Sequence, residues 1–263
     1  MTRLTRFERG GAFVPFLMLG DPDPSSCRAL LDEVVASGAD ALELGIPFSD
    51  PVADGPTIQA AARRALRHGV TPGLCFDLIE DLRTRHPEIP VGLLVYANLV
   101  LARGMDDFYA RAGRAGVDGV LVADVPAREG EPFARAARSS GVDPVFIAAP
   151  NTPAPVLRRI AELGGGFTYV VARRGVTGVR NEAVMPPAEL FRALTEVHAP
   201  PAVVGFGISE PEHVRSALAL GAAGAISGSA VIQRIERLRR DPAMCRDEVG
   251  GFVRRMKDAT LAE

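Results

Sequence analysis

AFVPFLMLGDPDPSSCRALLDEVVASGADALELG, residues 12–45, contains one strand–helix–strand unit from which the fold can be predicted. The apolar run Phe13–Leu19 predicts a strand that is buried on both faces, as in a parallel sheet. Apolar residues then recur at spacings of three and four in Ser26–Ser37, which is typical of an amphipathic helix. A second short strand is predicted at Ala41–Leu44. The order indicates an α/β unit with a helical crossover.

The same alternation continues along the chain, with further helical patterns at Met105–Ala115 and Glu210–Leu220. Eight strand–helix alternations in 263 residues predict a single-domain (β/α)8 TIM barrel with extra short helices over residues 1–263. An open doubly wound sheet shares this alternation, but no GxGxxG motif follows the first strand. The predicted strands are Phe13–Leu19, Ala41–Leu44, Val91–Val95, Gly119–Val122, Asp143–Ile147, Thr168–Val171, Ala202–Gly205 and Gly224–Ile226.

Composition excludes several classes of protein. The formal charge is 30 − 32 = −2 and no basic block interleaves with aromatic residues, which argues against nucleic-acid binding. No apolar run approaches the length of a membrane span, and the charged N-terminus is unlike a signal peptide. Three widely spaced cysteines favour free thiols in a reducing compartment. We therefore expect a cytoplasmic protein.

The chain contains one lysine, Lys257, and no tryptophan. Any mechanism through a lysine Schiff base, including that of a Schiff-base aldolase or a PLP enzyme, would have to use this residue. It lies near the C-terminus inside an amphipathic run, so lysine chemistry is not expected.

Catalytic groups of such barrels lie at the C-terminal ends of the strands, which draws attention to Glu43. Strand alternation places Glu43 on the opposite face from Leu42 and Leu44. An interior carboxyl in apolar surroundings has a raised pKa, which suits proton transfer. A structural glutamate paired with an arginine or an amide is the alternative.

The loop after this strand carries further carboxylates close to the predicted barrel mouth. Asp54 precedes Gly55, Pro56 and a helical run, so it could simply cap that helix. With two carboxylates on one strand-end loop, one could act as acid or base while the other holds a developing positive charge.

Glycine-rich turns follow the last two predicted strands, at Gly205–Ser209 and Ser227–Ser229. Barrels often bind phosphate here with loop amides and a helix N-terminus, and such a site needs no lysine. The alternative is two tight turns whose glycines serve the backbone alone.

A long segment without periodicity begins at Arg173, and we interpret it as a loop that forms a lid. Tyr169 precedes it, and its inward hydroxyl would need a partner, for which a strand-end carboxylate would serve. The four histidines fall in or near helices and form no set typical of zinc, so no metal site is expected.

The segment ELGIPFSDPVADGPTIQ (residues 43–59) resembles the α subunit of tryptophan synthase. The resemblance runs almost end to end, through AFVPFLMLGDP, LLVYANL, VLVADVP, GVTG, GFGIS and GAAGAISGSA. It implies a barrel that cleaves indole-3-glycerol phosphate to indole and glyceraldehyde 3-phosphate, as a carbon–carbon lyase late in tryptophan biosynthesis. By this likeness Glu43 and Asp54 are the catalytic acid/base pair, and Tyr169 supports them.

The resemblance also implies binding roles for other positions. The phosphate of the substrate would be bound by Gly178, Phe206, Gly207, Gly228 and Ser229, and the lid would include Arg173 and Thr177. The indole pocket would be formed by Phe16, Leu94, Leu121, Ala123 and Ile147.

The family's α subunit acts with a PLP-dependent β subunit, so an α2β2 complex is implied, with PLP in the partner and no cofactor in this chain. Contacts with that partner would be made by Pro47, Phe48, Asp50 and Asn98. Three positions, Val52, Ala172 and Arg174, depart from the family's usual residues in the partner-facing loop and the lid. A stand-alone lyase that releases free indole, or a barrel that only binds a partner, are the alternatives.

Overall fold

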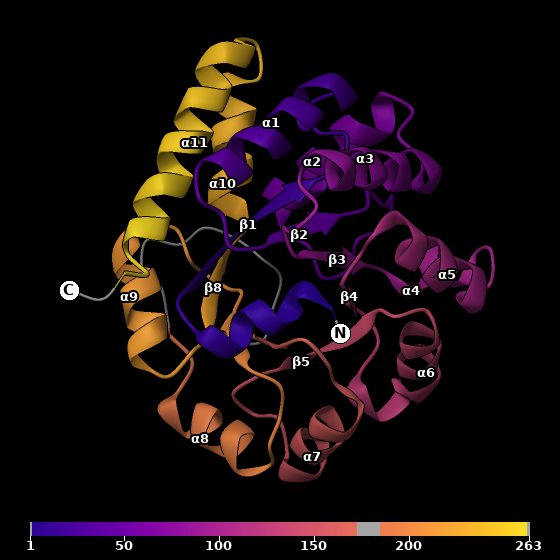
Figure 1. Ribbon diagram of the computed structural model, residues 1–263, viewed down its shortest axis with the longest axis vertical. Helices are drawn as coiled ribbons and strands as arrows, with labels where there is room; N and C mark the ends of the chain where they lie inside the picture. Colours follow the sequence, from indigo (N-terminus) through magenta and orange to yellow (C-terminus); the bar gives the residue numbers. More distant parts are fainter. Residues whose placement is uncertain (1, 173–184, 262–263) are drawn as a thin grey trace.

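The computed structural model describes residues 2–172 and 185–261 and shows a closed barrel of parallel strands (Figure 1). Each strand pairs with its neighbours in sequence, and β1 pairs with β8 to close the barrel. This confirms the predicted TIM barrel. The strands are β1 (Ala12–Met18), β2 (Leu42–Gly45), β3 (Val91–Val95), β4 (Gly119–Val122), β5 (Asp143–Ala148), β6 (Thr168–Val170), β7 (Ala202–Val204) and β8 (Gly224–Ser227).

Helices surround the strands on the outside of the barrel (Figure 1). The α-helices are α1 (Pro24–Ala36), α2 (Pro56–Arg67), α3 (Pro72–Arg85), α4 (Ala97–Leu101), α5 (Met105–Ala115), α6 (Glu131–Ser139), α7 (Ala154–Leu163), α8 (Ala188–Glu196), α9 (Pro211–Ala219), α10 (Ser229–Leu238) and α11 (Pro242–Asp258). Two 3-10 helices, η1 (Arg3–Arg9) and η2 (Ala127–Glu129), complete the described elements. Because helices cover the outer face, β1 is buried along its whole length.

Most element boundaries differ from the sequence prediction by one or two residues. The strands β3 and β4 and the helix α5 begin and end where they were predicted. The first helix begins at Pro24, earlier than predicted, because Asp23 accepts hydrogen bonds from the N–H groups of Ser25 and Ser26. Strand β6 ends at Val170 and β7 at Val204, each one residue short of the prediction.

The N-terminal end of the barrel is closed by η1. Its Leu4 and Phe7 are buried, and the Phe7 ring lies 4.9 Å from that of Phe167, just before β6. Lys257 belongs to the same end, where its Nζ lies 2.9 Å from the Asp40 carboxylate. Asp40 also accepts the N–H of Phe13 at the start of β1. Within the described part of the chain, the N-terminal entrance to the barrel axis is thus covered by η1.

Among residues 2–172 and 185–261, no helix has the length and apolar character needed to cross a membrane.

Candidate active site

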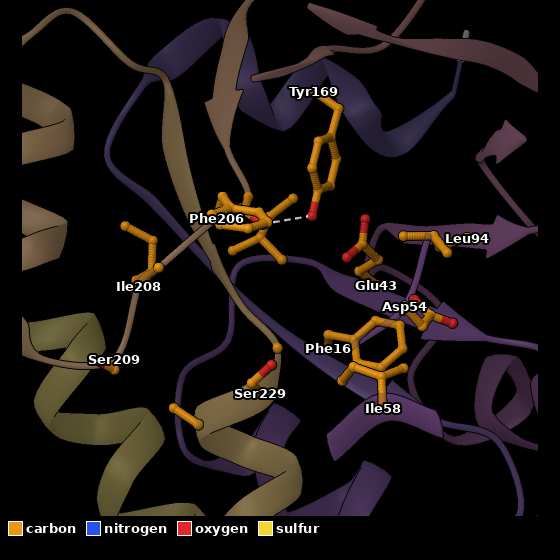
Figure 2. A pocket seen from close by; sticks show the side chains of 15 residues that line it. Phe16, Glu43, Asp54, Ile58, Leu94, Tyr169, Phe206, Ile208, Ser209 and Ser229 are labelled. Atoms are coloured by element: carbon orange, nitrogen blue, oxygen red, sulfur yellow. Dashed lines mark hydrogen bonds between the residues drawn. The ribbon is translucent and has the colours of Figure 1, made fainter. Parts of the chain in front are cut away.

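A cavity of about 660 Å³, open at its mouth, lies at the C-terminal ends of the strands (Figure 2). Carboxyl groups and apolar side chains form one side, and the glycine-rich loops after β7 and β8 form the other. The lining residues are Phe16, Glu43, Asp54, Ile58, Leu94, Tyr169, Gly205, Phe206, Gly207, Ile208, Ser209, Ile226, Gly228, Ser229 and Ala230.

Glu43 projects from β2 into this cavity, as strand alternation predicted. It is paired with Phe16 of β1 and Gly92 of β3 in the register of the sheet, and is 4% exposed. Burial, together with the negative charge of Asp54, raises the pKa of Glu43 to about 8. At neutral pH the side chain is therefore a protonated acid that can donate a proton to a ligand.

Asp54 enters the cavity from the loop between β2 and α2. It does not cap α2, because Gly55 is the N-cap residue and the helix has no side-chain cap. Burial raises the pKa of Asp54 to about 6, and a hydrogen bond from Tyr96 acts in the opposite direction. Asp54 is therefore mostly ionised at neutral pH, beside a protonated Glu43.

Tyr169 reaches the cavity from β6, but its hydroxyl does not bind a carboxylate as we expected. It donates to the backbone carbonyl of Gly205 over 2.7 Å, and Figure 2 shows the hydroxyl beside Glu43. A Cβ at Gly205 would lie 2.0 Å from the tyrosine ring. Tyr169 therefore fixes the loop after β7, and only glycine fits beside it.

The glycine-rich loops bring backbone amides to the cavity. Gly207 has φ +76°, a conformation that glycine adopts without strain. Helix α10 begins at Ser229 without a side-chain cap, and Gly228, Ser229 and Ala230 all line the cavity. The first turn of α10 thus presents its N-terminal end to the site, which suits an anion such as phosphate.

Two of the predicted indole-pocket residues, Phe16 and Leu94, line the cavity. The other three do not: Leu121 and Ile147 lie in the neighbouring strands β4 and β5, and Ala123 follows β4. The predicted phosphate residues Phe206, Gly207, Gly228 and Ser229 all line it. Gly178, Arg173, Thr177 and Arg174 lie outside the described residues.

The predicted partner contacts lie in the segments that follow β2 and β3. Pro47 is buried, whereas Asp50, in the loop between β2 and α2, and Asn98, in α4, are exposed. The Phe48 ring stacks on Tyr96 with centroids 5.3 Å apart. Val52 is 73% exposed in the same loop, whereas Ala172 is buried after β6.

Several residues at the site were not singled out from the sequence. Ile58, Ile226 and Ala230 add apolar wall, and Tyr96 contacts Asp54 from outside the cavity lining. Ile58 lies in the first turn of α2, and its spacing from Asp54 in the preceding loop gave no signal in the sequence. Within the described ranges, no group of three or more histidine, cysteine, aspartate or glutamate side chains is arranged to hold a metal ion.

A family model described as "Tryptophan synthase alpha chain" matches residues 3–261. The tryptophan synthase alpha chain of Shewanella amazonensis is 56% identical over 250 residues, covering 95% of this chain and 94% of that protein. That of Photobacterium profundum is 54% identical over 250 residues, with 95% and 93% coverage.

Solved structures agree with these sequence relatives. The alpha chain from Legionella pneumophila is 30% identical, with a TM-score of 0.87 over 99% of this chain and 97% of its own. A chain from the tryptophan synthase a2b2 complex of Pyrococcus furiosus is 38% identical, with a TM-score of 0.85 over 94% and 98%. The family model and these relatives match nearly the whole chain. This protein therefore belongs to the tryptophan synthase alpha chain family.

Proposed function

We propose that this chain cleaves indole-3-glycerol phosphate to indole and glyceraldehyde 3-phosphate with Glu43 and Asp54 as its catalytic pair. The observation that carries the proposal is the presence of both buried carboxyl groups in one cavity with an anion-binding loop pair. The raised pKa of Glu43 and the smaller rise at Asp54 give one acid and one base at neutral pH.

The two sides of the cavity suggest how the substrate is oriented. The indole ring would lie against Phe16 and Leu94, on the side where the carboxyl groups are found. The phosphate would bind to backbone amides at Gly207, Gly228 and Ser229. The glycerol chain would then pass Glu43, which places the bond to be cleaved beside the acid.

The reaction is a retro-aldol cleavage that begins with protonation of the ring. Glu43 donates its proton to the ring carbon that bears the glycerol chain, leaving a cation centred on the ring nitrogen. The Asp54 carboxylate accepts the hydrogen bond of the ring N–H and stabilises this cation. Glu43 then takes the proton of the adjacent hydroxyl. As the carbonyl forms, the carbon–carbon bond breaks and its electron pair restores the aromatic ring.

This mechanism uses the substrate ring to accept electrons, so it requires no lysine. Lys257 is held by Asp40 at the opposite end of the barrel from the cavity. The structure thus separates the single lysine of the chain from the proposed chemistry.

A partner subunit is part of the proposal. Because the Pyrococcus furiosus relative is described in an a2b2 complex, we propose that this chain binds a β subunit in the same stoichiometry. The PLP would belong to that subunit, and the rim formed by Phe48, Asp50 and Asn98 would face it. The three buried, free cysteines are consistent with action in the reducing cytoplasm.

The test is indole release from indole-3-glycerol phosphate, with and without a cognate β subunit. Glu43→Gln should lower kcat roughly 10²–10⁴-fold with little change in KM, because the acid is lost while the binding groups remain. The wild-type profile of kcat/KM, which reports the free enzyme, should be bell-shaped between about pH 6 and about pH 8, where Asp54 is ionised and Glu43 protonated.

Glu162→Gln is a matched control. This glutamate is exposed near the end of α7 and pairs with Arg159, so its loss should leave kcat unchanged. A Glu43→Gln protein that turns over at the wild-type rate would sink the assignment.

A further inference from the structure

We propose that Gln59 is a positioning residue, whose side chain holds the main chain of Asp54 against helix α2 and so fixes where the carboxylate meets the substrate. The inference rests on the proposed function of Asp54 and deepens it. Gln59 lies near the start of α2 and, within the described ranges, is not one of the residues that line the cavity. It therefore acts on a bound ring only through the residues that it contacts.

The contact between the two residues is a hydrogen bond from a side chain to the main chain. The Nε2 of Gln59 donates to the backbone carbonyl of Asp54 over 2.8 Å. The backbone N–H of Gln59 donates to the carbonyl of Gly55, the N-cap residue of α2, over 3.0 Å. Gln59 thus binds two consecutive carbonyls at the point where the loop enters the helix.

The loop before Asp54 offers little support of its own. It connects β2 to α2 without regular structure, and both Asp50 and Val52 in it are exposed. The N–H of Asp54 donates to the carbonyl of Pro51 in the same loop, but over 3.3 Å, which is a long hydrogen bond. Asp54 is buried, so loss of the Gln59 donor would leave its carbonyl in need of another partner. The main chain would then have to move.

Helix α2, in contrast, is firmly attached to the rest of the barrel. Arg64 on α2 donates from two nitrogens to the buried carboxylate of Asp21, which follows β1, over 2.7 and 2.9 Å. The same guanidinium pairs with Glu236 on α10. The buried residues of the helix are Ile58, Ala61, Ala62 and Ala65. Gln59 therefore connects Asp54 to a rigid element and not to the loop that carries it.

The exact position of Asp54 matters because its proposed role is a single directional contact. Asp54 reaches the cavity from the entry to α2 (Figure 2), and its carboxylate would accept the ring N–H of the substrate. A hydrogen bond weakens steeply when its distance and angle depart from the optimum. A misplacement of about 1 Å can lower a rate by as much as roughly 10²-fold.

The first experiment compares indole with benzothiophene, a ring of nearly the same shape that has no N–H group. Binding of indole is followed by its fluorescence, and benzothiophene is measured by displacement of indole. The wild type should prefer indole roughly tenfold or more, because only indole donates to the Asp54 carboxylate. Gln59→Met keeps the length of the side chain but has no donor. Its preference for indole should fall to about threefold or less, with the Kd of benzothiophene changed less than about twofold.

The ratio of the two dissociation constants separates positioning from a merely structural role. General loosening of the barrel would weaken both rings equally and leave the ratio as in the wild type, which would overturn the proposal. Gln233→Met, the same change at an exposed position of α10, is the matched control and should keep the wild-type ratio. A wild type that binds both rings equally would instead refute the proposed role of Asp54, and with it this inference.

Turnover provides a second readout. Gln59→Met should lower kcat for indole-3-glycerol phosphate roughly tenfold, and Gln233→Met should leave it unchanged. In an Asp54→Asn background, Gln59→Met should have almost no further effect, because the side chain acts through the Asp54 carboxylate. Losses that simply multiply in the double variant would overturn the proposal. Gln59→Glu, which has the same shape but no donor when ionised, should behave like Gln59→Met in both experiments.

Discussion

At the scale of single residues, burial acts on Glu43 and Asp54 to different extents. Glu43 lies on a strand inside the barrel, where burial and the nearby charge of Asp54 favour its neutral form. Asp54 lies on a loop and receives a hydrogen bond, so its charged form is less disfavoured. Two groups of nearly the same chemistry thereby acquire opposite protonation states at neutral pH.

The raised pKa of Glu43 has a consequence for stability. Its pKa is about 8 in the folded chain, against 4.5 when the group is unperturbed. Between these values the folded state retains a proton that the unfolded state releases, so folding stability falls as pH rises. Glu43→Gln removes the contribution of this residue to the dependence, whereas that of Asp54 remains. We expect the variant to be more stable than the wild type by about 1–3 kcal/mol at pH 7.

Thermal or urea unfolding of both proteins from about pH 4 to about pH 8 would measure the effect. The two stabilities should agree near pH 4 apart from a constant offset, and the variant should gain steadily above it. A difference that stays constant with pH would contradict the raised pKa of Glu43.

The roles of individual side chains were only partly predictable. Strand alternation was enough to predict the direction of the Glu43 side chain, because that direction depends only on its neighbours in the strand. The partner of Tyr169 was predicted wrongly, since a tyrosine hydroxyl lies far from its backbone and the position of Gly205 depends on tertiary packing. Tyr96 was not identified, because no local pattern relates it to Asp54 in another loop.

At the scale of elements, one buried hydrogen bond joins the two glycine-rich loops. The Oγ of Ser227, at the end of β8, donates to the carbonyl of Ile208 in the loop after β7 over 2.7 Å. Ser227→Ala would leave this carbonyl without its donor, at a cost of about 1–3 kcal/mol. Because both loops line the proposed phosphate site, we expect KM for indole-3-glycerol phosphate to rise more than kcat falls.

Thr168→Val is the matched control for this prediction. The Thr168 Oγ1 donates to the carbonyl of Pro200 over 3.0 Å, a comparable bond at the opposite end of the barrel. Loss of this hydrogen bond should lower the free energy of unfolding by a similar amount but leave KM for indole-3-glycerol phosphate unchanged. If both variants raise KM equally, general loosening of the barrel explains the effect.

The elements themselves followed from the sequence, because strands buried on both faces read as continuous apolar runs. The predicted boundaries of the elements were less accurate than their order. At β7, for example, Gly205 continues the apolar run, but it belongs to the loop held by Tyr169. The pairing of Ser227 with Ile208 had no signature in the sequence, since either residue could face the core or the helices.

At the scale of the whole molecule, the two ends of the barrel have different functions. The N-terminal end is closed by η1 and by the ion pair of Lys257 with Asp40, and contributes to stability. The C-terminal end is open and holds every residue of the cavity. This separation follows from the parallel strands, because all eight loops that can vary for function lie on one side.

Because the chain contains no tryptophan, the fluorescence of bound indole can be measured without emission from tryptophan in the protein. The chain has three tyrosines and no tryptophan, so indole excited at the red edge of its absorption should be the sole source of emission. Indole bound against Phe16 and Leu94 leaves water, and its emission should shift to the blue and saturate with protein concentration.

Phe16→Ala removes one apolar wall of the cavity and should weaken indole binding roughly tenfold or more. Phe133→Ala, on α6 outside the cavity, should not weaken it. Emission that stays like that of free indole at saturating protein would show that the ring does not enter this cavity, and a tenfold loss in both variants would point to damage to the barrel.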